Sequence, residues 1–314
     1  MNRSIVLILC LIAHICTSVF SQADVSMVTH WNNRANYNPA SIVKPGYLYL
    51  FSNIQNQWVG YAGAPKVINM QASVYSDNLN SAVGVSVVAD KNGLTQAFNP
   101  TLLYAYCIST ESTMLSFGIS GGVFWRTFNN SGYEAESDID PLLIYKFSPS
   151  LAPDANIGVE FQSRYIVAGL STTHVFSLFN ESSDYLNTNH RYGYLIYKNT
   201  DSDLLNYYFG LHMINRNGLV ITEGNTGLRF KNPNGLIKGP AELFDIGFSY
   251  RSTRQMAAFL GIMITPDIRI GYAYEHNFRT YLRAFDTHEL MLEYRIPVRE
   301  FNCKTCRNND YWYF

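Results

Sequence analysis

The sequence predicts an all-β protein, specifically a transmembrane antiparallel β-barrel of the outer-membrane type with about 14 strands. Three observations support this fold class. Apolar and polar residues alternate with a period of two along most of the chain, as in strands with one apolar face. Only 15% of the 314 residues are charged, whereas an average soluble domain carries about 25%. The alternating segments span roughly 9–12 residues, close to the length that a tilted strand needs to cross a bilayer.

The overall composition excludes several other classes of protein. Hydrophobic residues make up 47% and aromatic residues 15% of the chain, which is far too much for a disordered protein. The formal net charge of −1 argues against a basic surface for nucleic acid. A soluble all-β sandwich or propeller is the remaining alternative, but it would need more charge on its outside.

Residues 1–21 are predicted to form a secretory signal peptide. A basic residue, Arg3, precedes an apolar run from Ile5 to Ile15, and the small Ser21 offers a cleavage position. A membrane anchor is the alternative, but the run is shorter than the ~17–25 apolar residues of a spanning helix. No uncharged apolar stretch after residue 21 is long enough for one either. An exported chain of this kind is either soluble or a barrel.

Residues 22–65 lack clear membrane alternation, so we expect a plug-like or collar-like segment on the periplasmic side. The alternative is a segment that merely closes the periplasmic mouth. Trp31, Trp58 and Tyr61 would be amphipathic anchors there, and Gly60, Gly63 and Pro65 would shape a tight entry into the barrel wall.

Residues 66–297 carry the alternation and are predicted to form the barrel, in fourteen or fifteen strands. The segment 289–296 is the clearest, since its apolar residues alternate with Glu289, Glu293 and Arg295. Lipid accepts such strands only when the sheet closes on itself, because every backbone polar group must be paired. The strand count leaves open which of the connections 129–140, 173–189 and 231–242 face outward. Other apolar faces lie at 68–74, 83–87, 102–108, 115–125, 157–161, 246–250 and 268–274.

Residues 298–314 form a predicted tail with Cys303 and Cys306 in a C-x-x-C pattern. This pair predicts a small local disulfide or two free thiols. A tetrahedral zinc site would need a second pair of ligands, so no metal is expected.

A G-x-S-x-G pattern at residues 118–122 is the one string typical of catalysis. A nucleophile elbow needs its serine at a strand-to-helix turn, whereas Ser120 lies in the middle of an alternating strand. The glycines are better explained as relief of crowding inside the barrel. We therefore expect no enzyme activity and no cofactor.

Several local strings together resemble the PorP/SprF family of outer-membrane proteins, over roughly residues 27–297. These strings are His30–Asn33, Tyr37–Ala40, Gln57–Pro65, Gly247–Arg251, Ile270–Glu275 and His288–Arg295. Two features depart from the family pattern: Glu275, where the family more often has Asp, and the cysteine-bearing tail.

The resemblance implies a non-catalytic barrel of the type IX secretion and gliding machinery in the outer membrane of a Gram-negative bacterium. Implied partners are outer-membrane lipid, periplasmic lipoproteins including a peptidoglycan-binding one, and in some relatives a surface adhesin. The alternative is an outer-membrane channel or transporter for a small hydrophobic or polar solute. His288 and Glu289 are expected to point inward. The family-motif residues that could contact a partner are His30, Trp31, Asn38, Pro39, Trp58, Gly60, Gly63, Pro65, His288 and Glu289.

Overall fold

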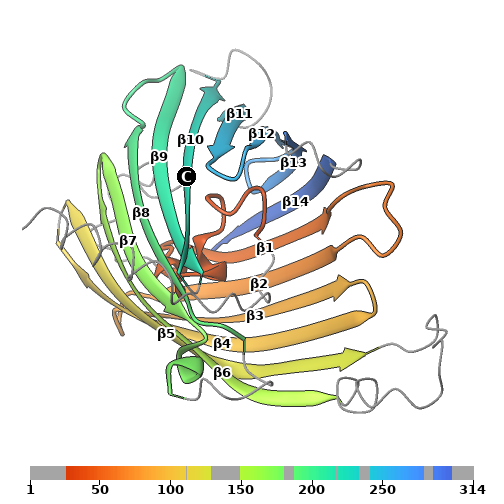
Figure 1. The fold of residues 1–314 in the computed structure, drawn as a ribbon. Coiled ribbons are helices and arrows are strands. Elements are labelled where there is room, and N and C mark those ends of the chain that lie inside the picture. The colour runs from red at the N-terminus through yellow and green to blue at the C-terminus, as the bar shows by residue number, and fades with distance from the viewer. Residues whose placement is uncertain are drawn as a thin grey trace, which may run out of the picture.

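The computed structural model describes residues 26–110, 112–128, 149–179, 187–216, 218–232, 241–278 and 286–298. In this part of the chain, 14 antiparallel strands close into one barrel, in which each strand pairs with its neighbours in sequence and β1 pairs with β14 (Figure 1). The predicted fold class is confirmed. The predicted signal peptide, Cys303, Cys306 and all of the tail beyond residue 298 lie outside the described residues.

The strands alternate in direction around the barrel wall. Their bounds are β1 Tyr47–Asn56, β2 Lys66–Ser76, β3 Ser81–Asn92, β4 Thr95–Ser109, β5 Thr113–Phe128, β6 Ser150–Ser163, β7 Ile166–Thr173, β8 His190–Asn199, β9 Leu205–Arg216, β10 Leu219–Lys231, β11 Glu242–Arg251, β12 Gln255–Met263, β13 Ile268–Asn277 and β14 Asp286–Pro297. Three short 3-10 helices are η1 Arg34–Asn36, η2 Pro39–Ile42 and η3 Val175–Leu178. In the described part of the chain, no helix is long and apolar enough to cross a membrane.

The two faces of each strand carry opposite chemistry. Outward side chains such as Leu102, Phe117 and Leu290 are 69%, 47% and 56% exposed, whereas the inward Glu289 and Glu293 are buried. Because successive residues of a strand point to opposite faces, the alternation read from the sequence places an apolar band outside and polar groups inside.

The even number of strands gives the barrel two distinct ends. We call the end where β1 begins and β14 finishes the near end, and the opposite one the far end. The connections 77–80, 110–112, 164–165, 200–204, 232–241 and 264–267 join strands at the near end. The two longest connections, 129–149 and 174–189, join strands at the far end. Of the three connections whose side the sequence left open, the first two therefore lie at the far end and the third, 232–241, lies at the near end.

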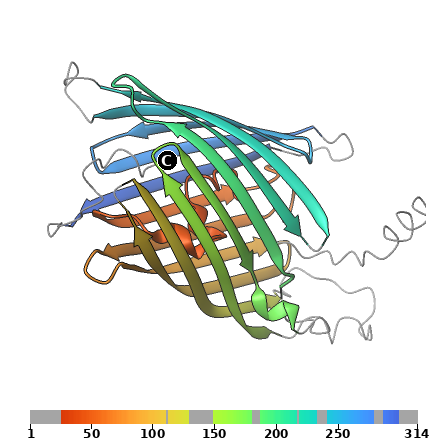
Figure 2. The same cartoon turned by 90° about the vertical axis from the view of Figure 1, so that its left-hand side faces the viewer.

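Residues 26–46, which we call the plug, lie inside the barrel (Figure 2). Side chains from β2, β6, β10, β13 and β14 all contact this segment, and these strands stand on different sides of the wall. The Ser26 carbonyl accepts a hydrogen bond from Gln55 near the far end of β1 (3.2 Å), whereas Tyr47 begins β1 at the near end. The plug therefore runs through the lumen from the far half to the near end.

The barrel begins earlier than predicted. Strand β1, Tyr47–Asn56, falls inside the range 22–65 that was expected to lie outside the barrel wall. Both faces of its first half are apolar, because the inward Tyr49 and Phe51 belong to the hydrophobic cluster that also contains Val28 and Trp31 of the plug. The core of the protein thus lies between the plug and the wall.

Candidate functional site: the plugged lumen

The first turn of the plug is held by one buried carboxylate. Glu289 of β14, 1% exposed, accepts hydrogen bonds from the backbone N–H groups of Val28 (2.7 Å) and Thr29 (3.3 Å) and from the Thr29 hydroxyl. It also accepts from the side-chain amides of Asn53 (3.0 Å) and Gln55 (3.2 Å) on β1. Glu289 therefore joins the plug to both strands of the β1–β14 seam, which closes the barrel.

A second contact holds the plug to another part of the wall, at β10. His30 Nε2 lies 2.9 Å from Glu223 Oε1 of β10, and Arg251 Nε donates to the other oxygen of the same carboxylate at 2.8 Å. The His30 ring also packs edge-on against His212, with ring centroids 4.6 Å apart. Side chains from β9 and β10 thus contact His30, and Arg251 of β11 holds the carboxylate that His30 meets.

An arginine–carboxylate pair anchors the middle of the plug. Arg34 donates from Nε and Nη2 to the two oxygens of Glu160 on β6, at 2.8 and 3.2 Å. The Tyr194 hydroxyl donates to the same carboxylate. Burial lowers the pKa of Arg34, but the Glu160 carboxylate outweighs burial and the net pKa lies above its ordinary value. Such a two-pronged pair fixes orientation as well as distance.

The 3-10 helix η2 sits directly against two glycines of the wall. Asn38 caps this helix by accepting from the Ala40 N–H (3.0 Å), and its amide donates to Tyr194 Oη at 2.7 Å. A Cβ added at Gly118 of β5 would lie 2.1 Å from the Ala40 nitrogen, and one at Gly158 of β6 would lie 2.0 Å from Asn38 Oδ1. Only a residue without a side chain lets the plug approach this closely.

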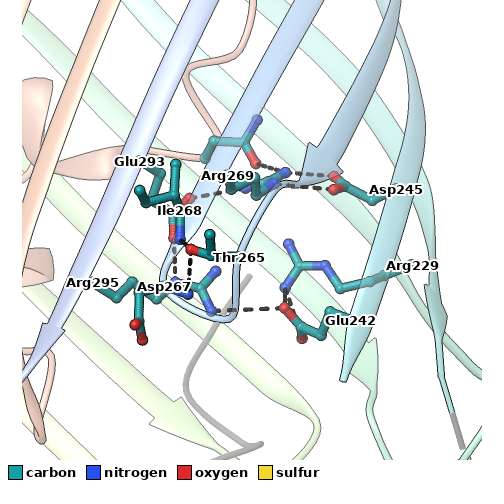
Figure 3. A network of polar contacts seen from close by, with 10 residues as sticks. Arg229, Glu242, Asp245, Thr265, Asp267, Ile268, Arg269, Glu293 and Arg295 are labelled. Carbon is teal, nitrogen blue, oxygen red and sulfur yellow. Dashed lines mark hydrogen bonds and ion pairs between the residues drawn. The ribbon is translucent and has the colours of Figure 1, made fainter. Parts of the chain in front are cut away.

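A charged network lies between the plug and the near end (Figure 3). Arg269 donates to Glu293 at 2.9 Å and to Asp245 at 3.0 Å, and its third contact is Asn32 of the plug at 3.3 Å. Arg295 donates to Glu293 at 2.5 Å. Arg229 donates to Glu242 at 3.2 Å. Buried charges need such partners, because an unpaired ion is costly away from water.

The one sequence pattern typical of catalysis, at residues 118–122, lies within a strand of the wall. Ser120 lies within β5 and accepts a hydrogen bond from Asn156 at 2.9 Å. Gly118, two residues earlier on the same face of β5, lies against Ala40 of the plug. This agrees with the prediction that glycines on this face relieve crowding inside the barrel. Among the described residues, no group of three or more His, Cys, Asp or Glu side chains could hold a metal ion.

The structure brings five of the ten family-motif residues together in the lumen. His30, Trp31, Asn38 and Pro39 belong to the buried part of the plug, and Glu289 holds its first turn. Trp58, Gly60, Gly63 and Pro65 lie apart from them, in the connection 57–65 at the far end.

Two of the predicted side-chain orientations are wrong. Trp31 is 4% exposed and packs in the interior cluster, so it is not an anchor at the membrane interface. His288 points outward, where its Nδ1 lies 2.6 Å from the Tyr272 hydroxyl. Adjacent residues of a strand must face opposite ways, so His288 and Glu289 could not both point inward.

The sequence analysis missed the wall residues that bind the plug. Glu160, Tyr194, Glu223 and Arg269 all stand at inward positions of strands. For the three charged residues the available signal was the charge itself, because a charged residue on a barrel strand avoids the lipid-facing side. That signal identifies lumen residues without saying which of them touch the plug.

Comparison with known proteins places these features in a family. Residues 19–294 match the family described as type IX secretion system membrane protein PorP/SprF. A search of curated proteins finds no match.

Several solved structures share the fold at low sequence identity. A deletion mutant of the TodX monoaromatic hydrocarbon channel has a TM-score of 0.51 and 11% identity, covering 85% of this chain and 94% of its own. The CymD monoaromatic hydrocarbon channel has a TM-score of 0.50 and 12% identity, covering 90% and 95%. The P. putida toluene transporter TodX has a TM-score of 0.50 and 11% identity, covering 86% and 95%. At such identities the likeness concerns the fold alone.

Proposed function

Because the chain belongs to the PorP/SprF family of type IX secretion system membrane proteins, we propose that it is a non-catalytic outer-membrane component of that machinery, which anchors periplasmic parts or a surface adhesin. The observation that carries this proposal is the plug. Glu289, Glu223 and Glu160, on three different strands, hold residues 28–34 inside the lumen. A barrel filled in this way is suited to presenting fixed surfaces at its two ends.

The lengths of the connections support an orientation in the membrane. Outer-membrane barrels have short periplasmic turns and longer extracellular loops. The near-end connections are mostly short, and 129–149 and 174–189 lie at the far end. We therefore place the near end in the periplasm of a Gram-negative bacterium. The periplasmic partners, a peptidoglycan-binding lipoprotein among them, would then meet the near end, and an adhesin would meet the far end.

A matched pair of cross-linking positions tests this assignment. Leu79 lies in the near-end turn 77–80 and is 70% exposed, and Leu219 begins β10 at the far end and is 60% exposed. A photo-activated amino acid at position 79 is expected to capture periplasmic components of the secretion machinery in intact envelopes. The same group at position 219 serves as the control and is expected not to capture them. Mass spectrometry of the cross-linked bands is the measurement.

The cross-linking outcomes separate the versions of the proposal. Capture of a large surface protein at position 219 alone would favour an adhesin as the partner. Capture of no secretion component from either position would contradict a role in the machinery.

A solute channel is the second candidate function, because the solved structures with this fold include a toluene transporter. The plug argues against an open lumen. The purified intact chain is therefore expected to show no steady conductance in planar bilayers, whereas a variant lacking residues 27–40 should conduct. The shift of the folded band on unheated gels would show that the variant still forms a barrel. A steady open current from the intact chain would favour the channel.

A further inference from the structure

Two lysines stand directly opposite each other on the outside of the barrel, at the far end of β2 and β3. Lys66 begins β2, and its partner in the strand register is Lys91 of β3. Both side chains are exposed, and they lie on the same faces as the outward Ile68 and Val85. Opposed residues of an antiparallel pair have Cα atoms about 4.5–5.5 Å apart. The barrel wall therefore holds these two positive charges, which we call the lysine pair, side by side.

The lysine pair marks the far edge of the apolar band. From there toward the near end, the outward residues of β2 within Ile68–Val74 and of β3 within Val83–Ala89 are all apolar. The outward row next to the pair continues with Phe98 and Trp125, which are register partners and are 41% and 49% exposed. Aromatic side chains of this kind form the girdles at the membrane interfaces of outer-membrane barrels. The lysine pair thus lies at the height where acyl chains give way to lipid headgroups.

No negative group of the described chain balances the lysine pair. Neither ammonium group has a carboxylate within ion-pair distance in this part of the structure. The flanking residues in the register, Asn56 of β1 and Gln96 of β4, are uncharged. Asp286, which faces outward where β14 begins, contacts the His276 ring at 2.8 Å instead. Like charges that are directly opposite destabilise a sheet, so a bound anion would relieve a repulsion that the barrel itself leaves in place.

The loops next to the lysine pair fix its position. The Gly93 N–H donates to the Gly63 carbonyl at 2.9 Å, which joins the turn after β3 to the connection 57–65 before β2. Figure 1 shows both loops at the same end of the barrel. Both glycines adopt positive φ, 60° at Gly93 and 78° at Gly63, a conformation that favours residues without a side chain. Because the backbone on both sides is already ordered, binding at the pair would cost little further ordering.

We propose that the lysine pair binds the phosphate group of lipid A, the glycolipid of the outer leaflet, and that its acyl chains lie along the apolar band. A phosphate monoester carries about 1.5–2 negative charges near pH 7, which matches two ammonium groups, and lysine binds phosphate as a point charge. Phe98 and Trp125 lie one row nearer the middle of the membrane, where they can contact the sugar and the first part of the chains.

The inference rests on the proposed function for its orientation, because that proposal places the far end at the cell surface. The two can fail separately. Lipid binding is measured on the purified barrel, so its absence would leave the secretion role untouched. A failed cross-link from position 79 would equally leave the lipid site untouched.

The test is native mass spectrometry of the detergent-purified full chain mixed with purified lipid A. The natural chain is expected to retain one lipid A molecule at low lipid concentration. The double variant Lys66→Gln/Lys91→Gln should bind it at least about tenfold more weakly. The matched control is Arg164→Gln/Arg191→Gln, which removes the same two charges from a near-end turn and from an exposed position of β8. This control should change the binding little.

Two further measurements separate a lost site from a damaged barrel and identify the source of the phosphate. Without lipid, the double lysine variant should unfold at the same or a higher urea concentration than the natural chain, because it no longer opposes like charges. Lipid A from which the phosphate groups have been removed should bind at least about tenfold more weakly to the natural chain. An excess of inorganic phosphate should not displace lipid A, since it makes no contact with the apolar band.

Four results would overturn the proposal. The first is equal lipid A binding by the natural chain and the double lysine variant. The second is an equal loss in the arginine control, which would make the effect one of overall charge. The third is displacement of lipid A by inorganic phosphate, which would assign the lysine pair to a soluble anion. The fourth is tighter binding of phosphatidylglycerol than of lipid A.

Discussion

Replacing Glu289 with alanine is expected to release the first turn of the plug and to loosen the seam between β1 and β14. The substitution removes the acceptor of the Val28 and Thr29 N–H groups and of the Asn53 and Gln55 amides, and these donors would remain inside the lumen. A buried donor that loses its partner costs about 1–3 kcal/mol, against a net gain of about 0.5–1.5 kcal/mol for the hydrogen bond itself. Because Glu289→Ala leaves several such donors, we expect a loss of about 3–5 kcal/mol in the free energy of unfolding.

Trypsin provides a direct measurement of this release. Arg34, 7% exposed, is protected while the plug is in place and becomes a cleavage site when it leaves the lumen. Purified Glu289→Ala is expected to be cut after Arg34 quickly and to unfold at a lower urea concentration than the natural chain. Glu289→Gln, which keeps one acceptor oxygen, should lie between them.

An exposed ion pair supplies the control for Glu289. Asp201 accepts from Arg164 at 2.7 Å, with side chains that are 31% and 48% exposed. Surface pairs of this kind contribute roughly 0–1 kcal/mol, so Asp201→Asn should leave both the cleavage rate and the urea midpoint nearly unchanged. Continued protection of Arg34 in Glu289→Ala would show that this carboxylate does not hold the plug.

The barrel wall could be predicted because the alternation of lipid-facing and inward residues is a local pattern. Every second residue of a strand faces lipid, so segments such as 68–74 and 115–125 reveal their outer face without reference to any other part of the chain. The inward Glu289, Glu293 and Arg295 follow from the same rule. The predicted count of fourteen or fifteen strands is close to the 14 observed, although 13 of these lie within residues 66–297 and β1 precedes that range.

The same rule fails where the lumen is filled. Strand β1 begins with the residues Tyr47 to Phe51, all apolar, so no alternation marks it. Its inward Tyr49 and Phe51 are buried against the plug and not in water. An apolar inner face is thus a consequence of the plug, and it could be recognised only once the plug was known to lie inside.

The contacts of the plug depend on pairings across long stretches of chain. Arg34 meets Glu160, 126 positions away, and Val28 meets Glu289, 261 positions away. Several inward carboxylates were available to each plug residue, and the closed geometry of the barrel decides between them. The family strings indicated that His30, Asn38 and Glu289 matter together, but periodicity alone gave no reason to connect them.

Gly118→Ala is the substitution expected to disturb the plug from the wall side. The new Cβ would lie 2.1 Å from the Ala40 nitrogen and 2.4 Å from the Pro39 carbonyl carbon, so either η2 or the strand must move. Overpacking of this kind usually costs about 1–3 kcal/mol and sometimes more. Because the contact is with backbone atoms and not with a flexible side chain, we expect the upper part of that range.

Gly121→Ala on the same strand is the matched control, since a Cβ there meets nothing within 4 Å. Gly118→Ala is expected to speed tryptic cleavage after Arg34 and to lower the urea midpoint, whereas Gly121→Ala should change neither. The reason is that the two glycines face opposite sides of β5, and only Gly118 faces the plug. If both variants behaved alike, the loss would come from strand propensity and η2 would not seat against Gly118. A protected Arg34 in Gly118→Ala would likewise contradict that close approach.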